Sequence, residues 1–530
     1  MRTDRMRRLA GVAFLSVISL IAAGCAGESA TTGDRTSSLD AGIVNATTET
    51  TTPVSGGTLT YSGYSAVTTL DPAKAQIAGA SGGTELAAIY DTLMRYDPVA
   101  KEFEPKLAQS LTANTDNTVW TLTLRDNVQF SDGQELDAQA VRLSIERYVA
   151  NKAPQSSLWA AKIRSMETPD ASTVTFDLAE PWTGIRSMLA TGPGMVVAPS
   201  AQGEQFAPVG AGAFTVEEFA PNEELILEAR ADYYGGKPNV DKLRMISIIG
   251  GQPTAESLKS GSIDSAYIRN LVPAMDLVSN GYPGYVDLLS LGSVANVNTA
   301  PGRPGSDVRV RQAMALAIDP AVLDTRVNDG KGFPGQEIFQ ETSRWHNDVP
   351  TIGTDPTKAR ELLEQAKADG YDGKISYLAM QDPTAQATAL GVQAMLNSVG
   401  FETSIDYVNA PSDLVKKMYA DHDYDIGAAS VGVSEADPYE RLYTTLKTGG
   451  RNNATGYSDA TTDELLDKLG VSVTDEEKRS ALADISARLY ETSPLLIWGA
   501  NPALNVWAKN VHGVSLSLDG MMFFDQAWKS

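Results

Sequence analysis

The sequence predicts a mixed α/β fold in a chain long enough for two or three compact domains. Segments with the spacing of a strand alternate with segments with the spacing of a helix along most of the 530 residues. Many of the strand segments follow one another closely, as antiparallel hairpins do. These observations favour a mixed α/β architecture over an all-helical or an all-strand fold.

The first half of the chain contains strands and two helices that the spacing of apolar residues defines. Strands are expected at 56–61, 119–125, 173–178 and 224–229, and helices at 81–90 and 137–149. Asp137 stands where an N-cap is needed. The second half is richer in helices, which are expected at 308–318, 355–368, 384–399, 463–469 and 475–490. Asp355 precedes a proline at the start of one of them, and Gly400 ends another.

The N-terminus has the pattern of an export signal. Four arginines precede residues 9–23, an apolar run of 15 residues without a charge. Such a run is too short to cross a membrane comfortably and is typical of a signal-peptide core, so we predict a signal peptide over residues 1–24. Residues 26–53 contain 11 Ser or Thr and few large apolar residues, which predicts a flexible tether over 25–53. The folded part is expected from residue 54 onward.

Composition excludes several classes of function. The chain has 43 Lys and Arg against 66 Asp and Glu, a formal net charge of −23, so no nucleic-acid partner is expected. Its single cysteine, Cys25, rules out a disulfide framework. The three histidines, His346, His422 and His512, leave little room for a zinc site or for histidine-based catalysis. We therefore predict no metal site and no cofactor.

Only one segment matches a catalytic motif. Residues 79–83 have the G-x-S-x-G spacing of a nucleophile elbow, with Ser81 at its centre. That elbow needs a hydrophobic strand directly before it, and residues 71–76 do not form one. A glycine-rich entry to a helix is the better interpretation. No phosphate-binding glycine loop and no pair of histidines at helical spacing occurs, so no catalytic residue is predicted.

Several segments, in order, resemble the family 5 extracellular solute-binding proteins, which are the peptide, nickel and oligosaccharide receptors of ATP-driven bacterial importers. The most specific is VWTLTLRDNVQFSDGQELDAQAV at 119–141. The others lie at 69–72, 89–93, 209–214, 231–236, 308–319, 359–363 and 452–463. The small residues before Cys25 also resemble the lipobox of bacterial lipoproteins, in which the cysteine carries the lipid, although Ala22 replaces the usual leucine.

The resemblance implies a two-lobed periplasmic-binding-protein-like fold of type II, cluster C, with a two-strand hinge. Lobe I would combine residues 54–287 with 497–530 and include a small extra domain at 85–195, and lobe II would span 288–496. The chain would be a monomeric substrate-binding lipoprotein of an ATP-binding-cassette importer. It would deliver a peptide-sized solute to a permease and an ATPase from the outer face of the cell membrane or from the periplasmic space.

In the peptide receptors of this family, an aspartate four residues before a proline pairs with the α-ammonium group of the peptide. Counting back from Pro438, that position is Ser434 here, and the preceding tryptophan position is Val431. The loss of this carboxylate favours oligosaccharides or blocked peptides over peptides with a free N-terminus. A shift of one residue would instead make Glu435 the anchor.

The resemblance also implies which residues line the cleft. From lobe I we expect Tyr64, Ser65, Tyr267 and Arg269, from lobe II Trp345, Gln381, Ser434, Glu435 and Tyr439, and from the hinge crossing Trp498. Two alternatives remain open. A cell-surface polymer hydrolase would use cleft carboxylates as acid and base, and a ligand-sensing module would bind a solute without transporting it.

Overall fold

The computed structural model describes residues 39–46, 52–75, 77, 79–202 and 206–530. The predicted signal peptide, Cys25 and the first part of the predicted tether lie outside the described residues. Within the described ranges, no helix has the length and the apolar composition that crossing a membrane requires.

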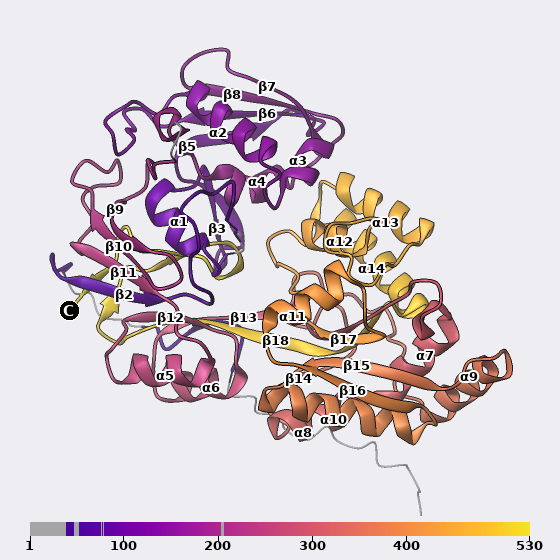
Figure 1. Ribbon diagram of the computed structural model, residues 1–530. Helices are drawn as coiled ribbons and strands as arrows, with labels where there is room; N and C mark the ends of the chain where they lie inside the picture. The colour runs from indigo at the N-terminus through magenta and orange to yellow at the C-terminus, as the bar shows by residue number, and fades with distance from the viewer. Residues whose placement is uncertain (1–38, 47–51, 76, 78, 203–205) are drawn as a thin grey trace, which may run out of the picture. The chain divides into compact units, whose positions relative to one another are not determined.

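One large mixed sheet runs through the chain and connects its two halves (Figure 1). In spatial order its main strands are β16 (Glu402–Val408), β15 (Lys374–Met380), β17 (Ile426–Ala429), β13 (Gly284–Val297), β18 (Leu495–Trp507), β12 (Ser265–Ile268), β2 (Thr58–Ser62), β11 (Lys242–Ile246), β10 (Glu224–Ala229) and β9 (Phe214–Ala220). The last five strands fall in predicted lobe I and the first three in predicted lobe II. The long strands β13 and β18 are common to both halves.

The pairing of β13 with β18 is irregular at its centre. Leu289 lies opposite Asn501, but the next paired residue on β13, Ser293, lies opposite Gly499, so β13 contains extra residues there. Leu291 within this bulge has a positive φ of 52°. Gly292 follows it, and a Cβ at this position would collide with the backbone nitrogen of Asn501. The bulge marks the place where the chain passes from one lobe to the other.

Lobe I carries a separate small sheet within the predicted extra domain. This sheet has the order β5 (Ala108–Ala113), β6 (Val119–Leu124), β8 (Thr173–Leu178) and β7 (Ile163–Glu167). The helices of lobe I are α1 (Gly83–Tyr90), α2 (Ala138–Ala150), α3 (Ser156–Lys162), α4 (Ile185–Met188), α5 (Gly251–Lys259) and α6 (Leu271–Ser279), and β3 (Met94–Asp97) pairs with β4 (Glu102–Pro105). Asp137 caps α2 as predicted, because its side chain accepts a hydrogen bond from the Ala140 N–H at 2.8 Å.

Lobe II is formed by helices around β15, β16 and β17. They are α7 (Val308–Ala317), α8 (Pro320–Asn328), α9 (Pro356–Ala368), α10 (Pro383–Ser398), α11 (Pro411–Val415), α12 (Tyr439–Leu446), α13 (Ala460–Val471) and α14 (Asp475–Thr492). Helices α9 and α10 both begin with Asp-Pro-Thr, and the aspartates Asp355 and Asp382 cap them.

The short strands pair locally. The C-terminal strands form two small pairs, β19 (Val511–His512) with β22 (Trp528–Lys529) and β20 (Ser515–Leu516) with β21 (Met522–Phe523). The two-residue strand β14 (Phe333–Pro334) pairs with β18.

The prediction of a flexible tether is corrected for residues 39–45. Strand β1 (Gly42–Val44) pairs with β13 and extends the sheet. Leu39 is fully buried in the apolar core beneath lobe I, and the Asn45 side chain donates hydrogen bonds to the carbonyl oxygens of Val278 and Tyr282 at 2.7 and 2.9 Å. A few well-placed side chains therefore attach a segment whose composition alone predicts disorder.

Replacing Leu39 tests this attachment. Leu39→Ala removes a fully buried side chain and should lower the free energy of unfolding by about 2–5 kcal/mol. Ile43→Ala is the matched control, because Ile43 lies in β1 with 55% of its surface exposed and should change stability by less than about 0.5 kcal/mol. Urea unfolding measures both values. If Leu39→Ala is as stable as the unsubstituted protein, the attachment is contradicted and the predicted flexible tether stands for these residues as well.

Candidate functional site

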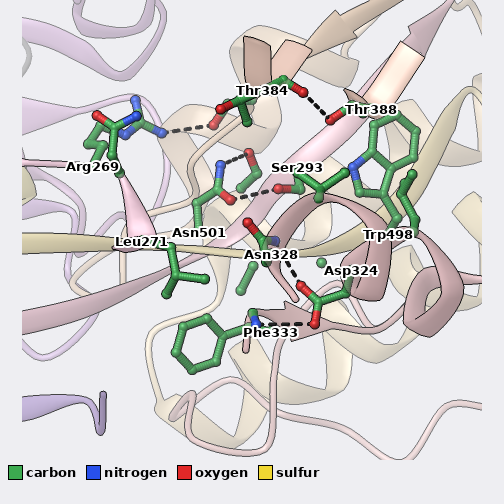
Figure 2. A pocket seen from close by; sticks show the side chains of 18 of the residues that line it. Arg269, Leu271, Ser293, Asp324, Asn328, Phe333, Thr384, Thr388, Trp498 and Asn501 are labelled. Carbon is green, nitrogen blue, oxygen red and sulfur yellow. Dashed lines mark hydrogen bonds between the residues drawn. The ribbon is translucent and has the colours of Figure 1, made fainter. Parts of the chain in front are cut away.

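Three cavities lie where residues of lobe I face residues of lobe II. The hinge cavity has a volume of about 610 Å³ and borders β13, β18 and the first turns of α6 and α10 (Figure 2). The acidic cavity, about 430 Å³, borders the lobe I part of β13 and the loop that follows β17. The side cavity, about 200 Å³, is its neighbour, because Ser434 and Asp519 line both. The hinge cavity and the acidic cavity have the size of solute-binding pockets, which occur preferentially between domains.

Polar side chains of the two crossing strands form one wall of the hinge cavity. Ser293 donates a hydrogen bond to Asn501 Oδ1 at 2.6 Å, and Asn501 Nδ2 donates to the Gly292 carbonyl at 2.8 Å (Figure 2). Both partners lie at the bulge, so these bonds fix its geometry. Trp498 on β18 supplies an apolar surface to the same cavity and is 9% exposed.

The opposite wall of the hinge cavity comes from lobe II. Asp324 on α8 accepts hydrogen bonds from Asn328 Nδ2 at 2.8 Å and from the Gly332 N–H at 3.1 Å, so its carboxylate is already held (Figure 2). The Tyr377 hydroxyl on β15 is buried in the same lining, and the described residues offer it no hydrogen-bond partner. Thr384 at the start of α10 lines the outer part. This wall therefore offers a solute mainly neutral polar groups.

A direct contact joins the lobes at the edge of the hinge cavity. The Arg269 guanidinium donates a hydrogen bond to Ser430 Oγ at 2.9 Å, which links the end of β12 to the end of β17. It also lies over the Tyr64 ring, 5.6 Å from the ring centroid, and Tyr64 meets Tyr267 edge-to-face at 5.9 Å. Arg269 and the two tyrosines therefore form a contact between the lobes at the edge of the hinge cavity.

Carboxylates gather around the acidic cavity. Asp287 on β13, Glu435 on the loop after β17 and Asp519 near the C-terminus all line it. Burial raises the pKa of Asp287, the negative charges of Glu435 and Asp519 add to this effect, and the pKa reaches about 7. Burial also raises the pKa of Glu435. Hydrogen bonds from the Ser343 hydroxyl and the Arg344 N–H lower this pKa and so partly offset the effect of burial. The cavity thus concentrates negative charge at a cost to the folded protein.

The loop that carries Glu435 is attached to the hinge. The Val431 N–H donates to the Leu291 carbonyl and the Val433 N–H to the Ser290 carbonyl, both at 3.0 Å, so the loop pairs with the bulge of β13. On its other side, Trp345 Nε1 donates to the Glu435 carbonyl at 2.9 Å. The position of Glu435 therefore follows the conformation of the hinge.

Four of the residues expected in the cleft line these cavities. They are Arg269 and Trp498 in the hinge cavity and Ser434 and Glu435 in the acidic cavity. Tyr64 and Tyr267 lie beside them through their contacts with Arg269 and with each other. The remaining four, Ser65, Trp345, Gln381 and Tyr439, line none of the three cavities.

The positions of these four explain the difference. Trp345 is fully buried and supports the Glu435 loop from below. Tyr439 is 3% exposed at the start of α12, where Tyr443 and Lys162 cover its ring. Gln381 and Ser65 lie in exposed loops, and the residues that follow Gln381 reach the hinge cavity in its place. Loop position alone does not separate supporting residues from lining residues.

Several cavity residues were not predicted from the sequence. Asp287 and Asn505 stand within the long apolar strands β13 and β18, and a polar residue in such a strand is a usable signal of a functional position. Asp519 lies in a short turn and carries no comparable signal. Ser293 and Asn501 gain their role from the register of the two strands, which the sequence does not display.

The described residues contain no group of three or more His, Cys, Asp or Glu side chains placed to hold a metal ion. His346 Nδ1 is 3.0 Å from the Phe339 carbonyl oxygen and His422 Nδ1 is 3.2 Å from that of Ala454, which are contacts within the fold. At the G-x-S-x-G segment, Gly79 lies against the backbone of Asp519. The glycine thus allows the segment before α1 to pack closely against the backbone of Asp519.

Comparison with known proteins identifies the family. Residues 102–453 match the model of the bacterial extracellular solute-binding proteins, family 5 (middle part). The chain belongs to this family. Among curated relatives, the probable D,D-dipeptide-binding periplasmic protein DdpA of Escherichia coli K12 is 24% identical over 415 residues, which cover 74% of this chain and 78% of the relative.

Solved structures of family 5 proteins have the same fold. The oligopeptide-binding protein AppA of Bacillus subtilis, solved with a nonapeptide, matches with a TM-score of 0.75 at 20% identity over 90% of this chain and 100% of that one. NikA of Brucella suis, solved with Fe(III)-EDTA, matches with a TM-score of 0.74 at 21% identity over 89% and 100%. The predicted two-lobed α/β fold is therefore confirmed, and β13 and β18 are the strands that cross between its lobes.

The raised pKa of Asp287 makes a prediction about pH. A carboxyl with a pKa near 4 in the unfolded chain and about 7 in the folded protein contributes stability at low pH that is lost as the pH rises through this window. Asp287→Asn removes this loss, so the melting temperature of the variant relative to the unsubstituted protein should rise between pH 5 and pH 8. Asp126→Asn, at an exposed position, should show no such trend. A difference for Asp287→Asn that stays constant with pH would contradict the assignment.

Proposed function

We propose that this family 5 protein is the substrate-binding subunit of an ATP-binding-cassette importer and captures a peptide-sized solute between its lobes. The observation that carries the proposal is the presence of large, partly polar cavities on both sides of the loop that joins lobe II to the hinge bulge. A solute lying along this loop would contact the crossing strands, lobe I and lobe II together.

Such contacts would favour a closed arrangement of the lobes. A ligand shifts the population toward closure only if it binds the closed form more tightly, which requires that it contact both lobes. The Arg269–Ser430 hydrogen bond is a lobe-to-lobe contact of the kind that would form or strengthen on closure. The closed, loaded protein would then deliver its solute to a membrane permease, and the ATPase subunit would drive transport.

The N-terminal sequence supports a place for this activity. We infer that residues 1–24 are removed on export and that Cys25 carries a lipid, which would hold a monomer at the outer face of the cell membrane or in the periplasmic space. The relatives of this chain include a probable D,D-dipeptide-binding periplasmic protein and a putative ABC transporter peptide-binding protein, in keeping with this proposal. A ligand-sensing role without transport would use the same cleft.

Ligand-dependent stabilisation tests solute binding directly. A solute that binds only the folded protein raises its stability by about 2.7 kcal/mol at a concentration of 100 times Kd. We expect at least one member of a library of peptides, saccharides and metal chelates to raise the melting temperature in a concentration-dependent way. The absence of a shift with every class would contradict the proposed function.

A matched pair of variants tests the place of binding. Thr384 and Thr357 are both exposed, and each is the second residue of a helix that begins with the sequence Asp-Pro-Thr. Only Thr384 lines the hinge cavity. Thr384→Arg should fill part of the cavity and weaken affinity for the identified solute at least about tenfold, or about 1.4 kcal/mol. Thr357→Arg should leave affinity unchanged. Titration calorimetry compares them, and equal affinities would remove the hinge cavity from the binding site.

A further inference from the structure

The two lobes meet at a second place, which involves none of the strands that cross between them. We call it the α3 contact: Pro154 and Lys162 of lobe I, which flank and end α3, lie against Tyr439, Arg451 and Gly470 of lobe II. Figure 1 shows α3 on the side of lobe I that faces α12 and α13. The Arg451 guanidinium donates a hydrogen bond to the Pro154 carbonyl at 3.1 Å, and both residues line the side cavity. The α3 contact therefore borders the space between the lobes.

Lys162 is the central residue of this contact. Its side chain is only 5% exposed, although lysine is rarely buried unless it is paired. The ammonium group forms an ion pair with Glu180 of lobe I and lies over the Tyr439 ring of lobe II, 4.9 Å from the ring centroid. A cation is attracted to the face of an aromatic ring, most strongly where water is excluded. Lobe II thus both buries this cation and compensates part of the cost of burying it.

The ion pair with Glu180 does not by itself explain why Lys162 is buried. Glu180 keeps 45% of its side chain exposed. Arg164 forms a similar pair with Asp177 of its own lobe, and these two side chains are 61% and 40% exposed. Arg164 is hydrogen-bonded to Asp177 and Ala179 of lobe I, whereas Lys162 also reaches lobe II. The burial of Lys162 is consequently a property of the two lobes together.

A glycine of lobe II leaves space for the ammonium group. Gly470 lies within α13, where glycine is less favourable than alanine. A Cβ at this position would lie 2.8 Å from Lys162 Nζ and 2.7 Å from the Tyr439 hydroxyl oxygen, which is too close for either. The Tyr439 hydroxyl has no hydrogen-bond partner among the described residues, so the group that this side chain offers to Lys162 is its ring.

We propose that Lys162 and Tyr439 are positioning residues that hold the two lobes together, so that the α3 contact stabilises the closed arrangement before any solute is bound. This inference rests on the proposed function and concerns the regulation of the cleft. It also gives a role to Tyr439, which was expected to touch the solute and instead touches the other lobe.

A contact of this kind sets affinity without selecting a solute. Lys162 and Tyr439 line none of the three cavities, so they act on the solute only through the fraction of protein that is closed. The apparent Kd of a solute that binds the closed form rises as that fraction falls. Breaking the α3 contact should therefore weaken the binding of different solutes by one common factor.

The distance between the lobes in the absence of solute tests the proposal. Spin labels are attached in the variant Cys25→Ser, Ala150→Cys, Ser480→Cys, whose two labelled positions are exposed on α2 and α14. Pulsed electron paramagnetic resonance should show a shorter and a longer distance in this protein. Lys162→Ala and Tyr439→Leu, which remove the cation or the ring, should each lower the ratio of the shorter to the longer population at least about threefold.

Two matched controls accompany these variants. Arg164→Ala removes a cation of the same domain that contacts only its own lobe, and Tyr439→Phe removes the unpaired hydroxyl but keeps the ring. Both should keep the distribution of the unsubstituted protein. The absence of a shorter population in that protein, or an unchanged distribution in Lys162→Ala and Tyr439→Leu, overturns the proposal. A lowered melting temperature with an unchanged distribution also overturns it, because it indicates a structural role.

Solute affinity supplies the second measurement. Titration calorimetry of Lys162→Ala with two different solutes should show that both Kd values rise by the same factor, at least about threefold. Loss of binding for one solute and not the other overturns the proposal, because it indicates direct contact. The distance measurement needs no solute, so the failure of every solute to bind would contradict the proposed function and is distinguishable from a failure of the α3 contact.

Discussion

The pairing of β13 with β18 is the constraint on which the rest of this structure depends. These two strands belong to both lobes, and the bulge between Leu289 and Ser293 interrupts their register at the crossing. The bulge exposes backbone groups that pair with residues 431–433, so it also sets the position of the loop that lines the acidic cavity. The geometry of the hinge and the geometry of the candidate site are consequently fixed by the same few backbone hydrogen bonds.

The candidate site is built at the expense of stability. A core of apolar residues packs against one face of the crossing strands. The other face carries Asp287, whose pKa is raised by burial and by neighbouring negative charges, and Asn505, whose Oδ1 accepts no hydrogen bond from the described residues. Sites that recognise charged or polar solutes commonly keep such groups unpaired until the ligand arrives, and the rest of the fold compensates. Here the compensation comes from the extensive apolar cores of the two lobes and from helix caps such as Asp137, Asp355 and Asp382.

Local features of the fold could be predicted from the sequence, whereas most of the site could not. Alternating apolar residues in β6 and β8 and the Asp-Pro starts of α9 and α10 are signals that depend on neighbouring residues only. The attachment of β1 depends on Leu39 reaching a core formed by residues more than 200 positions away, and composition does not report such contacts. Trp345 and Tyr439 are expected in the cleft because they follow strands or flank the crossings, and in the structure both side chains are buried and line none of the three cavities. Asp287, Asn505 and Asp519 meet only through strand register and the return of the C-terminal segment.

A distance measurement between the lobes tests the central claim that solute binding closes the protein about the β13–β18 hinge. Ala150 on α2 and Ser480 on α14 are exposed and lie in different lobes, so both can be replaced by cysteine and spin-labelled in a variant in which Cys25 is replaced by serine. Pulsed electron paramagnetic resonance then reports the distribution of distances between the labels. The account predicts that a bound solute shifts the distribution to a single, shorter distance. An unchanged distribution at saturating solute would contradict it.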